Sequence, residues 1–163
     1  MKKLVRITFV VFCCFSLLAC TSSNDKGSDN ANKEEDIPIS FNNTFTFDDL
    51  EITFKDDIQW HQISNQYSDH DGAEVFSISM TITNKKSENH GLNMFYFTQY
   101  GSKGTKLDSI TAYFNDDVSW AGDMRPDATL ETRMYVLYDG DGDYYIKFSN
   151  FSTTVEVLIP ITK

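Results

Sequence analysis

The chain has 163 residues and a formal net charge of −10, with 24 acidic residues against 14 lysines and arginines. So acidic a surface repels the phosphates of nucleic acids and of anionic lipids, which argues against nucleic-acid binding and against a direct electrostatic hold on a membrane. All three cysteines lie at or before position 20. The rest of the chain therefore has no disulfide and no thiol nucleophile.

Residues 1–19 have the pattern of a secretory signal peptide. A basic start precedes an apolar run over residues 7–18, which is too short for a permanent membrane span. The tetrad Leu-Leu-Ala-Cys at positions 17–20 resembles a bacterial lipobox, which implies cleavage before Cys20 and lipidation of that residue. We therefore predict a lipid-anchored protein on the extracytoplasmic face of the cell membrane, attached through Cys20.

Residues 20–39 have almost no large apolar side chains, and they are predicted to form a flexible tether. Removal of residues 1–19 takes away three positive charges and no negative ones, so the formal charge of −10 becomes −13. The composition changes at position 40, where aromatic residues become frequent. About 120 residues suffice for one domain, which we place at 40–163.

The stretch 73–84 carries the strongest structural signal in the chain. One parity is apolar: Phe76, Ile78, Met80 and Ile82. The other parity carries hydroxyl groups: Ser77, Ser79, Thr81 and Thr83. Because a strand sends successive side chains to opposite faces, this stretch is predicted to be the central strand of a two-layer β protein.

Similar alternation recurs in short runs along the whole domain. They are 45–54, with a turn at Asp48-Asp49, and 58–60, 92–100, 107–114, 130–138, 144–148 and 155–161. The runs 130–138 and 144–148, joined by a Gly-containing loop, are predicted to form a β-hairpin. Seven to nine short strands predict an all-β fold, an immunoglobulin-like antiparallel β-sandwich.

The order of these features is similar to that of a known family. The pattern F-x-F-x-x-L-x-I-x-F spans residues 45–54, Gly-Ser-Lys-Gly stands at 101–104, and Gly-Asp-Met-Arg-Pro at 122–126. This resembles the immunoglobulin-like domains of unknown function in Gram-positive lipoproteins, related in fold to the mycobacterial immunoprotective secreted antigen. Members usually carry Gly after the proline, where this chain has Asp127. The resemblance implies an extracytoplasmic sandwich and supplies no catalytic residues.

Acidic residues alternate with glycines at Asp139, Asp141 and Asp143. Oxygen ligands at this spacing suit Ca²⁺, but a helix-loop-helix calcium loop needs Gly at its sixth position and Glu at its twelfth. Those positions hold Tyr144 and Asn150. A solvated turn is the preferred interpretation, and a weak divalent-cation site is the alternative. We predict no other metal site and no cofactor, because the histidines lie far apart in the sequence.

Residues for catalysis form no recognisable motif. The Gly-x-Ser-x-Gly nucleophile elbow is absent from the sequence. Carboxylates could still pair in space as in glycosidases: the candidates are Glu51, Glu74, Glu88, Glu131 and Glu156. We therefore predict a protein without enzymatic activity. The alternative is a small envelope hydrolase that uses clustered carboxylates.

Several apolar residues occupy the parity opposite the predicted core. They are Phe95, Phe97, Tyr135, Leu137 and Tyr145. If these faces meet solvent, they form an aromatic patch of the kind that marks an interaction surface. If loops cover the sheets, the same residues are buried. We predict a binding module whose partner is a cell-envelope protein or polymer.

Overall fold

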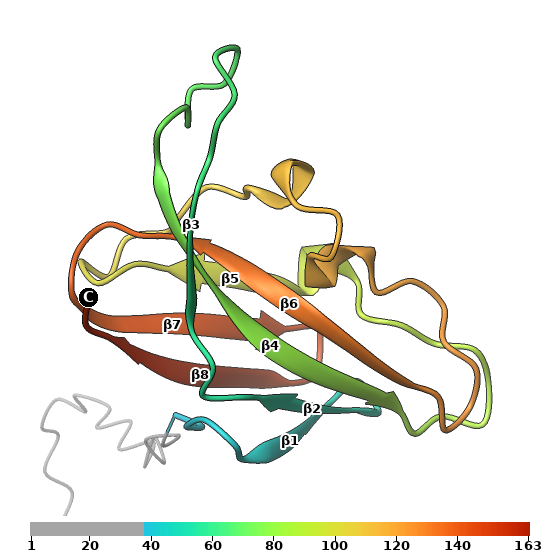
Figure 1. Cartoon of the computed structure of the whole chain (residues 1–163). Coiled ribbons are helices and arrows are strands. Elements are labelled where there is room, and N and C mark those ends of the chain that lie inside the picture. The colour runs from blue at the N-terminus through green and yellow to red at the C-terminus, as the bar shows by residue number, and fades with distance from the viewer. Residues whose placement is uncertain (1–37) are drawn as a thin grey trace, which may run out of the picture. The chain divides into compact units, whose positions relative to one another are not determined.

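The computed structural model describes residues 38–163, and the predicted signal peptide and most of the predicted tether lie outside the described residues. The described chain forms an antiparallel β-sandwich of eight strands, as predicted (Figure 1). The strands are β1 (Thr44–Phe47), β2 (Leu50–Phe54), β3 (Gln59–Gln62), β4 (Glu74–Asn84), β5 (Phe97–Tyr100), β6 (Thr129–Leu137), β7 (Gly142–Ser149) and β8 (Thr154–Ile161). Three 3₁₀ turns accompany them: η1 (Met94–Tyr96), η2 (Thr111–Tyr113) and η3 (Val118–Trp120). No helix in this part of the chain is long and apolar enough to cross a bilayer.

The larger sheet is built around β4, the strand predicted to be central. β2 and β3 pair with one edge of β4, β6 pairs with the other edge, and β1 lies outside β2. Phe54 pairs with Met80 and Gln59 pairs with Ser77. From Phe54 to Gln59 the chain that joins β2 to β3 advances five residues, while β4 advances only three. The connection 55–58 therefore holds two residues more than the strand beside it, and it forms a bulge. The smaller sheet has the order β5-β7-β8.

The core lies between the two sheets and follows the predicted parity. Phe76, Ile78, Met80 and Ile82 of β4 are fully buried. From the facing sheet come Tyr144, Ile146 and Phe148 of β7 and Val157, Ile159 and Ile161 of β8. The ring of Phe148 packs within 5.4–6.1 Å, centroid to centroid, of four other rings: Phe45, Phe47, Phe54 and Phe97. Burial of this apolar surface is the main stabilising contribution, since this part of the chain has no cysteine.

The predicted hairpin of 130–138 and 144–148 is wrong. β6 belongs to the larger sheet and β7 to the smaller one, so their connection crosses between the layers (Figure 1). Gly140 and Gly142 have φ angles of 132° and 144°, a region that favours glycine. The hydroxyl of Tyr144 accepts from the Asp139 N–H at 2.8 Å and donates to the Gly140 carbonyl at 2.9 Å, which fixes the turn.

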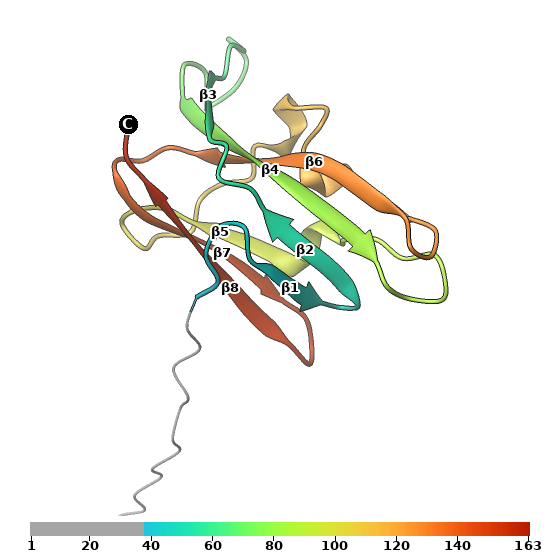
Figure 2. The same ribbon diagram turned by 60° about the horizontal axis from the view of Figure 1, so that its bottom comes forward.

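The predicted strand at 107–114 is also absent. The chain from 106 onward returns beside β5 and then forms η2 and η3, and η3 contacts β6. Figure 2 shows the same domain turned by 60°. Arg133 of β6 donates its backbone N–H to the Asp116 carbonyl at 3.1 Å, and Asp117 forms an isolated parallel bridge with the same residue. This segment therefore covers the outer edge of β6, as exposed sheet edges require.

Candidate interaction surface

A groove of about 370 Å³ opens beside the edge strand β5. Its apolar lining is Met94, Phe95, Phe97 and Leu107, and its polar lining includes Lys106, Asp108, Ser109 and Thr111. Phe95 is 83% exposed, and Met94 is 45% exposed. The groove thus offers aromatic contact area together with charges of both signs.

Local capping forces Phe95 outward. The side chain of Asn93 accepts a hydrogen bond from the Phe95 N–H at 3.0 Å, which begins the turn η1. Tyr96 packs its ring against Phe47, with centroids 6.0 Å apart, and so attaches the turn to the core. With Tyr96 packed against the core, the ring of Phe95 is left in solvent.

The backbone edge of β5 is open along part of the groove. The Gln99 carbonyl accepts from the Leu107 N–H at 2.9 Å, so residues 106–107 cover that end of the strand. Phe97 lies two residues earlier, and its backbone groups face the same edge because strand hydrogen bonding alternates with period two. No loop residue in the described chain bonds to the backbone of Phe97. This edge can therefore accept another strand.

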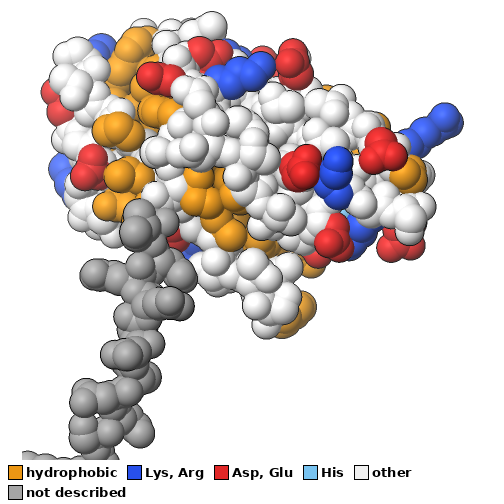
Figure 3. Space-filling model, turned by 90° about the horizontal axis from the view of Figure 1, so that it is seen from below, with side chains coloured by type: hydrophobic (Ala, Val, Ile, Leu, Met, Phe, Trp, Pro, Cys, Tyr) orange, Lys and Arg blue, Asp and Glu red, His pale blue; other side chains and the backbone are white. Residues whose placement is uncertain are grey.

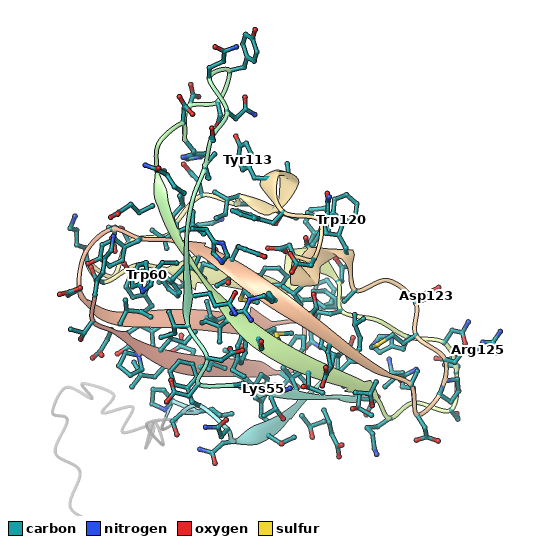
Figure 4. All side chains as sticks on the ribbon, viewed as in Figure 1. Lys55, Trp60, Tyr113, Trp120, Asp123 and Arg125 are labelled. Atoms are coloured by element: carbon teal, nitrogen blue, oxygen red, sulfur yellow. The ribbon has the colours of Figure 1, made fainter. Side chains whose placement is uncertain are left out.

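Trp120 adds a second exposed aromatic ring near η1. It is 66% exposed, and its turn η3 lies against η1 (Figure 4). Six large apolar side chains are exposed in residues 38–163, and three of them, Met94, Phe95 and Trp120, belong to these two neighbouring turns. Such a concentration of exposed apolar side chains is typical of interaction surfaces.

The outer face of the larger sheet carries a polar network around Arg133. The Nε of Arg133 donates to Ser77 Oγ at 2.8 Å, and its Nη1 donates to Ser79 Oγ at 2.7 Å. Ser77 Oγ also lies 2.7 Å from His61 Nε2. Burial of the His61 ring and then the charge of Arg133 hold the pKa of His61 below its ordinary value. At neutral pH the uncharged ring can therefore accept a hydrogen bond from the Ser77 hydroxyl.

A serine beside a neutral histidine is the pattern of an activated nucleophile. Here, however, Ser77 is fully buried. The ring of Phe114 stacks on Tyr135, with centroids 3.8 Å apart, and makes an edge contact with His61 at 5.9 Å. The aromatic rings thus cover the pair, which leaves Ser77 the role of linking β3, β4 and β6.

The five predicted surface residues do not form one patch. Phe95 and Phe97 line the groove. Tyr135 is only 6% exposed, which corrects its prediction as a surface residue. Leu137 is partly buried in a small cluster around Ile63, and Tyr145 lies on the outer face of the smaller sheet, opposite Tyr100.

The burial of Tyr135 results from the segment that follows η2. Phe114 covers its ring, and its hydroxyl donates to Asp116 Oδ1 at 2.7 Å. Burial, and then this hydrogen bond, raise the pKa of Tyr135 to about 12. The exposed residues Met94 and Trp120 were missed by the sequence analysis, because alternation says nothing about residues in 3₁₀ turns.

The carboxylates of the 139–143 turn are engaged by different partners. Asp139 Oδ1 accepts from the backbone N–H and the hydroxyl of Ser102, both at 2.9 Å. Asp141 Oδ1 accepts from the Tyr138 hydroxyl at 2.6 Å and from the Lys163 N–H at 3.0 Å. Within residues 38–163 there is no group of three or more potential metal-ligating side chains. Calcium binding by this turn stays a prediction.

Four of the five candidate glutamates are paired with lysines. The pairs are Glu51–Lys85 at 3.7 Å, Glu131–Lys55 at 3.3 Å, Glu156–Lys147 at 3.7 Å, and Glu74–Lys163. On the face seen in Figure 3, acidic and basic side chains likewise lie beside one another. Each of these four glutamates thus has a lysine beside it, in ion pairs of partly exposed side chains that contribute little to stability.

The fold defines the chain as an antiparallel β-sandwich domain, and solved structures of similar fold come from Gram-positive bacteria. The ycdA protein of Bacillus subtilis matches with a TM-score of 0.55 and 14% identity over 72% of this chain, which spans 38% of that protein. The yjhA protein of the same organism matches with a TM-score of 0.53 and 14% identity, covering 76% of this chain and 99% of that one. At this identity the likeness shows the fold alone.

No protein-family model and no curated protein sequence matches the chain. An uncharacterised β-sandwich protein from Clostridium difficile 630 is 17% identical over 78% of this chain and 97% of its own, with a TM-score of 0.45. The relation to the mycobacterial antigen stays a prediction.

Proposed function

We propose that this protein is a lipid-anchored, extracytoplasmic binding module without enzymatic activity, and that its partner binds at the groove beside β5. The observation that carries the proposal is the exposed ring of Phe95 at a groove next to an open strand edge. The lipobox ending at Cys20 supports the location. The fold is also similar to that of the ycdA protein of Bacillus subtilis, a provisionally named lipoprotein, which supports the same location.

The ligand proposed for the groove is an extended peptide segment of a cell-envelope protein. Such a segment can add to the edge of β5 at Phe97 and place its alternate side chains against Phe95 and Leu107. The volume of about 370 Å³ lies near the lower end of the range for ligand pockets, about 300–1,000 Å³, which suits a few side chains. Lys106 and Asp108 can select the charge of the flanking residues.

The absence of enzymatic activity is supported by how the candidate groups are engaged. Ser77 is buried beneath aromatic rings, and four of the candidate glutamates are held in ion pairs with lysines. Neither Ser77 nor these glutamates provide an accessible nucleophile or acid inside a concave site. A small hydrolase therefore remains the weaker alternative, and the 139–143 turn supports no catalytic step.

Photo-crosslinking in living cells tests the groove. A photoreactive phenylalanine analogue replaces Phe95 in the full lipidated chain, and the same analogue replaces Tyr67 as the control. Tyr67 is 91% exposed, but it lies in the loop joining β3 to β4. We expect a discrete crosslinked envelope protein from position 95 and none from position 67. Equal labelling at both positions, or none at either, contradicts the proposal.

A second experiment separates the anchor from the groove. When residues 1–20 are replaced by a signal peptide that is cleaved without lipidation, the acceptor of the lipid is absent and no apolar leader is retained, so the protein is expected to leave the membrane fraction while its fold is unchanged. Retention of this variant in the membrane after a high-salt wash would contradict lipid anchoring and leave the groove proposal untouched.

A further inference from the structure

The ammonium group of Lys163 lies against two aromatic rings beyond the end of β8. Its Nζ is 5.0 Å from the centroid of the Trp60 ring and 5.7 Å from that of Tyr138. The two rings meet edge to face, with centroids 5.0 Å apart and an interplanar angle of 89°. Both Nζ distances lie within the roughly 6 Å over which a ring face attracts a cation. The rings therefore form two walls of a cage around a cation.

Carboxylates complete this cage. Glu74 forms an ion pair with the ammonium group of Lys163. Asp141 accepts hydrogen bonds from the Tyr138 hydroxyl and from the Lys163 backbone N–H, and so fixes the ring and the backbone. The hydrogen bond to Asp141, and then burial, raise the pKa of Tyr138 to about 12. The ring therefore stays an uncharged phenol at neutral pH.

The walls of the cage are preformed by the sheet. Trp60 lies on β3 and packs edge-on against the buried ring of Phe76, with centroids 6.0 Å apart. Trp60 is 38% exposed, and Figure 4 shows it on the side of the domain where the described chain ends. Glu74 begins β4, and Tyr138 directly follows β6. None of these residues lines the groove beside β5.

We propose that the cage formed by Trp60, Tyr138 and Glu74 is a binding site for an alkylated ammonium group, such as the trimethylammonium of choline, and that Lys163 occupies it as an internal competitor. Two aromatic faces with a nearby carboxylate are the chemistry by which proteins recognise quaternary ammonium ligands. A methylated cation offers no N–H donors that need partners, so it can leave water at lower cost than the ammonium of Lys163. Because a ligand must displace Lys163, the apparent affinity falls with the fraction of open cage.

Tryptophan fluorescence of the full chain, in detergent without ammonium groups, tests the proposal. The chain has two tryptophans, so Trp120→Phe leaves Trp60 as the single reporter. Tetramethylammonium chloride is titrated against sodium chloride at constant ionic strength, with and without Lys163→Met. Methionine is unbranched and one heavy atom shorter than lysine, so it keeps most of the length of the side chain and removes its charge. We expect a saturable change in emission and a dissociation constant about tenfold lower in the Lys163→Met variant.

Loss of the cage provides the matched control. Tyr138→Leu in the Lys163→Met background is expected to abolish the saturable change, with the fold checked by thermal melting. Phosphatidylcholine in mixed micelles with the same detergent and free choline, added as competitors, distinguish a lipid headgroup from a small soluble ligand. A Lys163→Met variant without saturable binding overturns the site. Equal dissociation constants with and without Lys163 overturn its role as competitor.

Discussion

Arg133 on β6 and Asp57 in the bulge between β2 and β3 form an ion pair across the intervening strand β4, with 3.2 Å between Nη1 and Oδ2. The same guanidinium donates to the carbonyls of Asp57 and Ser77, both at 3.0 Å. The bulge is what makes the contact possible, because its two extra residues turn Asp57 over the outer face of β4. One side chain thus links three strands.

Arg133→Met is expected to lower the free energy of unfolding by about 2–3 kcal/mol, since it removes a guanidinium that is mostly buried and leaves its acceptors without their donors. Urea denaturation measures the change. Arg125→Met is the matched control, because Arg125 is exposed and takes part in no side-chain hydrogen bond or ion pair of the described chain; its effect should stay within about 0.5 kcal/mol. Equal effects of the two substitutions would disprove a structural role for the Arg133 network.

The pH dependence of stability should report the ionisation of Asp57. Desolvation alone would raise its pKa, but hydrogen bonds from Ser79 and the charge of Arg133 outweigh it and hold the pKa below 3.8. The folded state therefore binds fewer protons than the unfolded state, and this stabilisation is present above pH 3.8 and is lost as pH falls through the folded pKa. In Asp57→Asn the loss of stability below about pH 4 should be shallower. Urea denaturation curves at pH 7, 5, 4 and 3 compare the two proteins.

The contribution of Asp117 to stability should depend on pH in the opposite direction to that of Asp57. Burial raises the pKa of Asp117 above 3.8 despite hydrogen bonds from Ser119 and from the Tyr135 N–H. The folded state then binds more protons than the unfolded state, so the contribution present below pH 3.8 is lost as pH rises through the folded pKa. On acidification from pH 7 to 4, Asp117→Asn should therefore lose more stability than the wild-type protein. A difference between the two proteins that stays constant with pH refutes this assignment.

Strand parity was readable from the sequence because it depends only on neighbouring residues. The buried positions of β4, such as Ile78, follow from alternation alone. Alternation cannot distinguish a hairpin from a connection between sheets, since in both cases the apolar residues of the two runs face one core. The pairing of β6 with β4 instead of β7 depends on contacts between residues far apart in the sequence.

The candidate surface was predictable only in part, because its exposure depends on irregular segments that lie outside the strands. Phe95 and Tyr135 both occupy the parity opposite the core, yet the first is 83% exposed and the second is 6% exposed. Phe95 lies in the turn η1, where the Asn93 cap leaves its ring in solvent, whereas Tyr135 lies on β6 and is covered by Phe114 from the segment that follows η2. The path of that segment is set by tertiary hydrogen bonds such as that of Arg133 to Asp116. Residues in such irregular segments carry no periodic signal.

Two phenylalanines three residues apart should differ widely in their effect on stability. Phe148 is fully buried among four other rings, whereas Phe151, in the turn before β8, is completely exposed. Phe148→Ala is expected to cost about 3–5 kcal/mol, because it removes a large apolar side chain and leaves a cavity. Phe151→Ala should change stability by less than about 0.5 kcal/mol. Thermal and urea unfolding of both variants measure the contrast, and similar losses would contradict the placement of the core.

Gly91 is required by close packing next to η1. A Cβ at this position would lie 2.2 Å from the carbonyl oxygen of Gly122 and 2.8 Å from that of Ala121. The two segments cannot separate easily, because His90 and Met124 exchange backbone hydrogen bonds of 2.9 Å in both directions. Gly91→Ala is therefore expected to destabilise the domain by about 1–3 kcal/mol.

Gly122→Ala provides the control from the other side of the same contact. A Cβ at Gly122 would meet nothing within 4 Å, and the backbone there does not have a positive φ. Alanine should leave stability unchanged or raise it by a few tenths of a kcal/mol, because it restricts the unfolded chain. Urea denaturation of both variants tests the asymmetry. If Gly91→Ala proves as stable as Gly122→Ala, the close approach of the two segments that hold η1 in place is wrong, and with it the position of Phe95 at the groove.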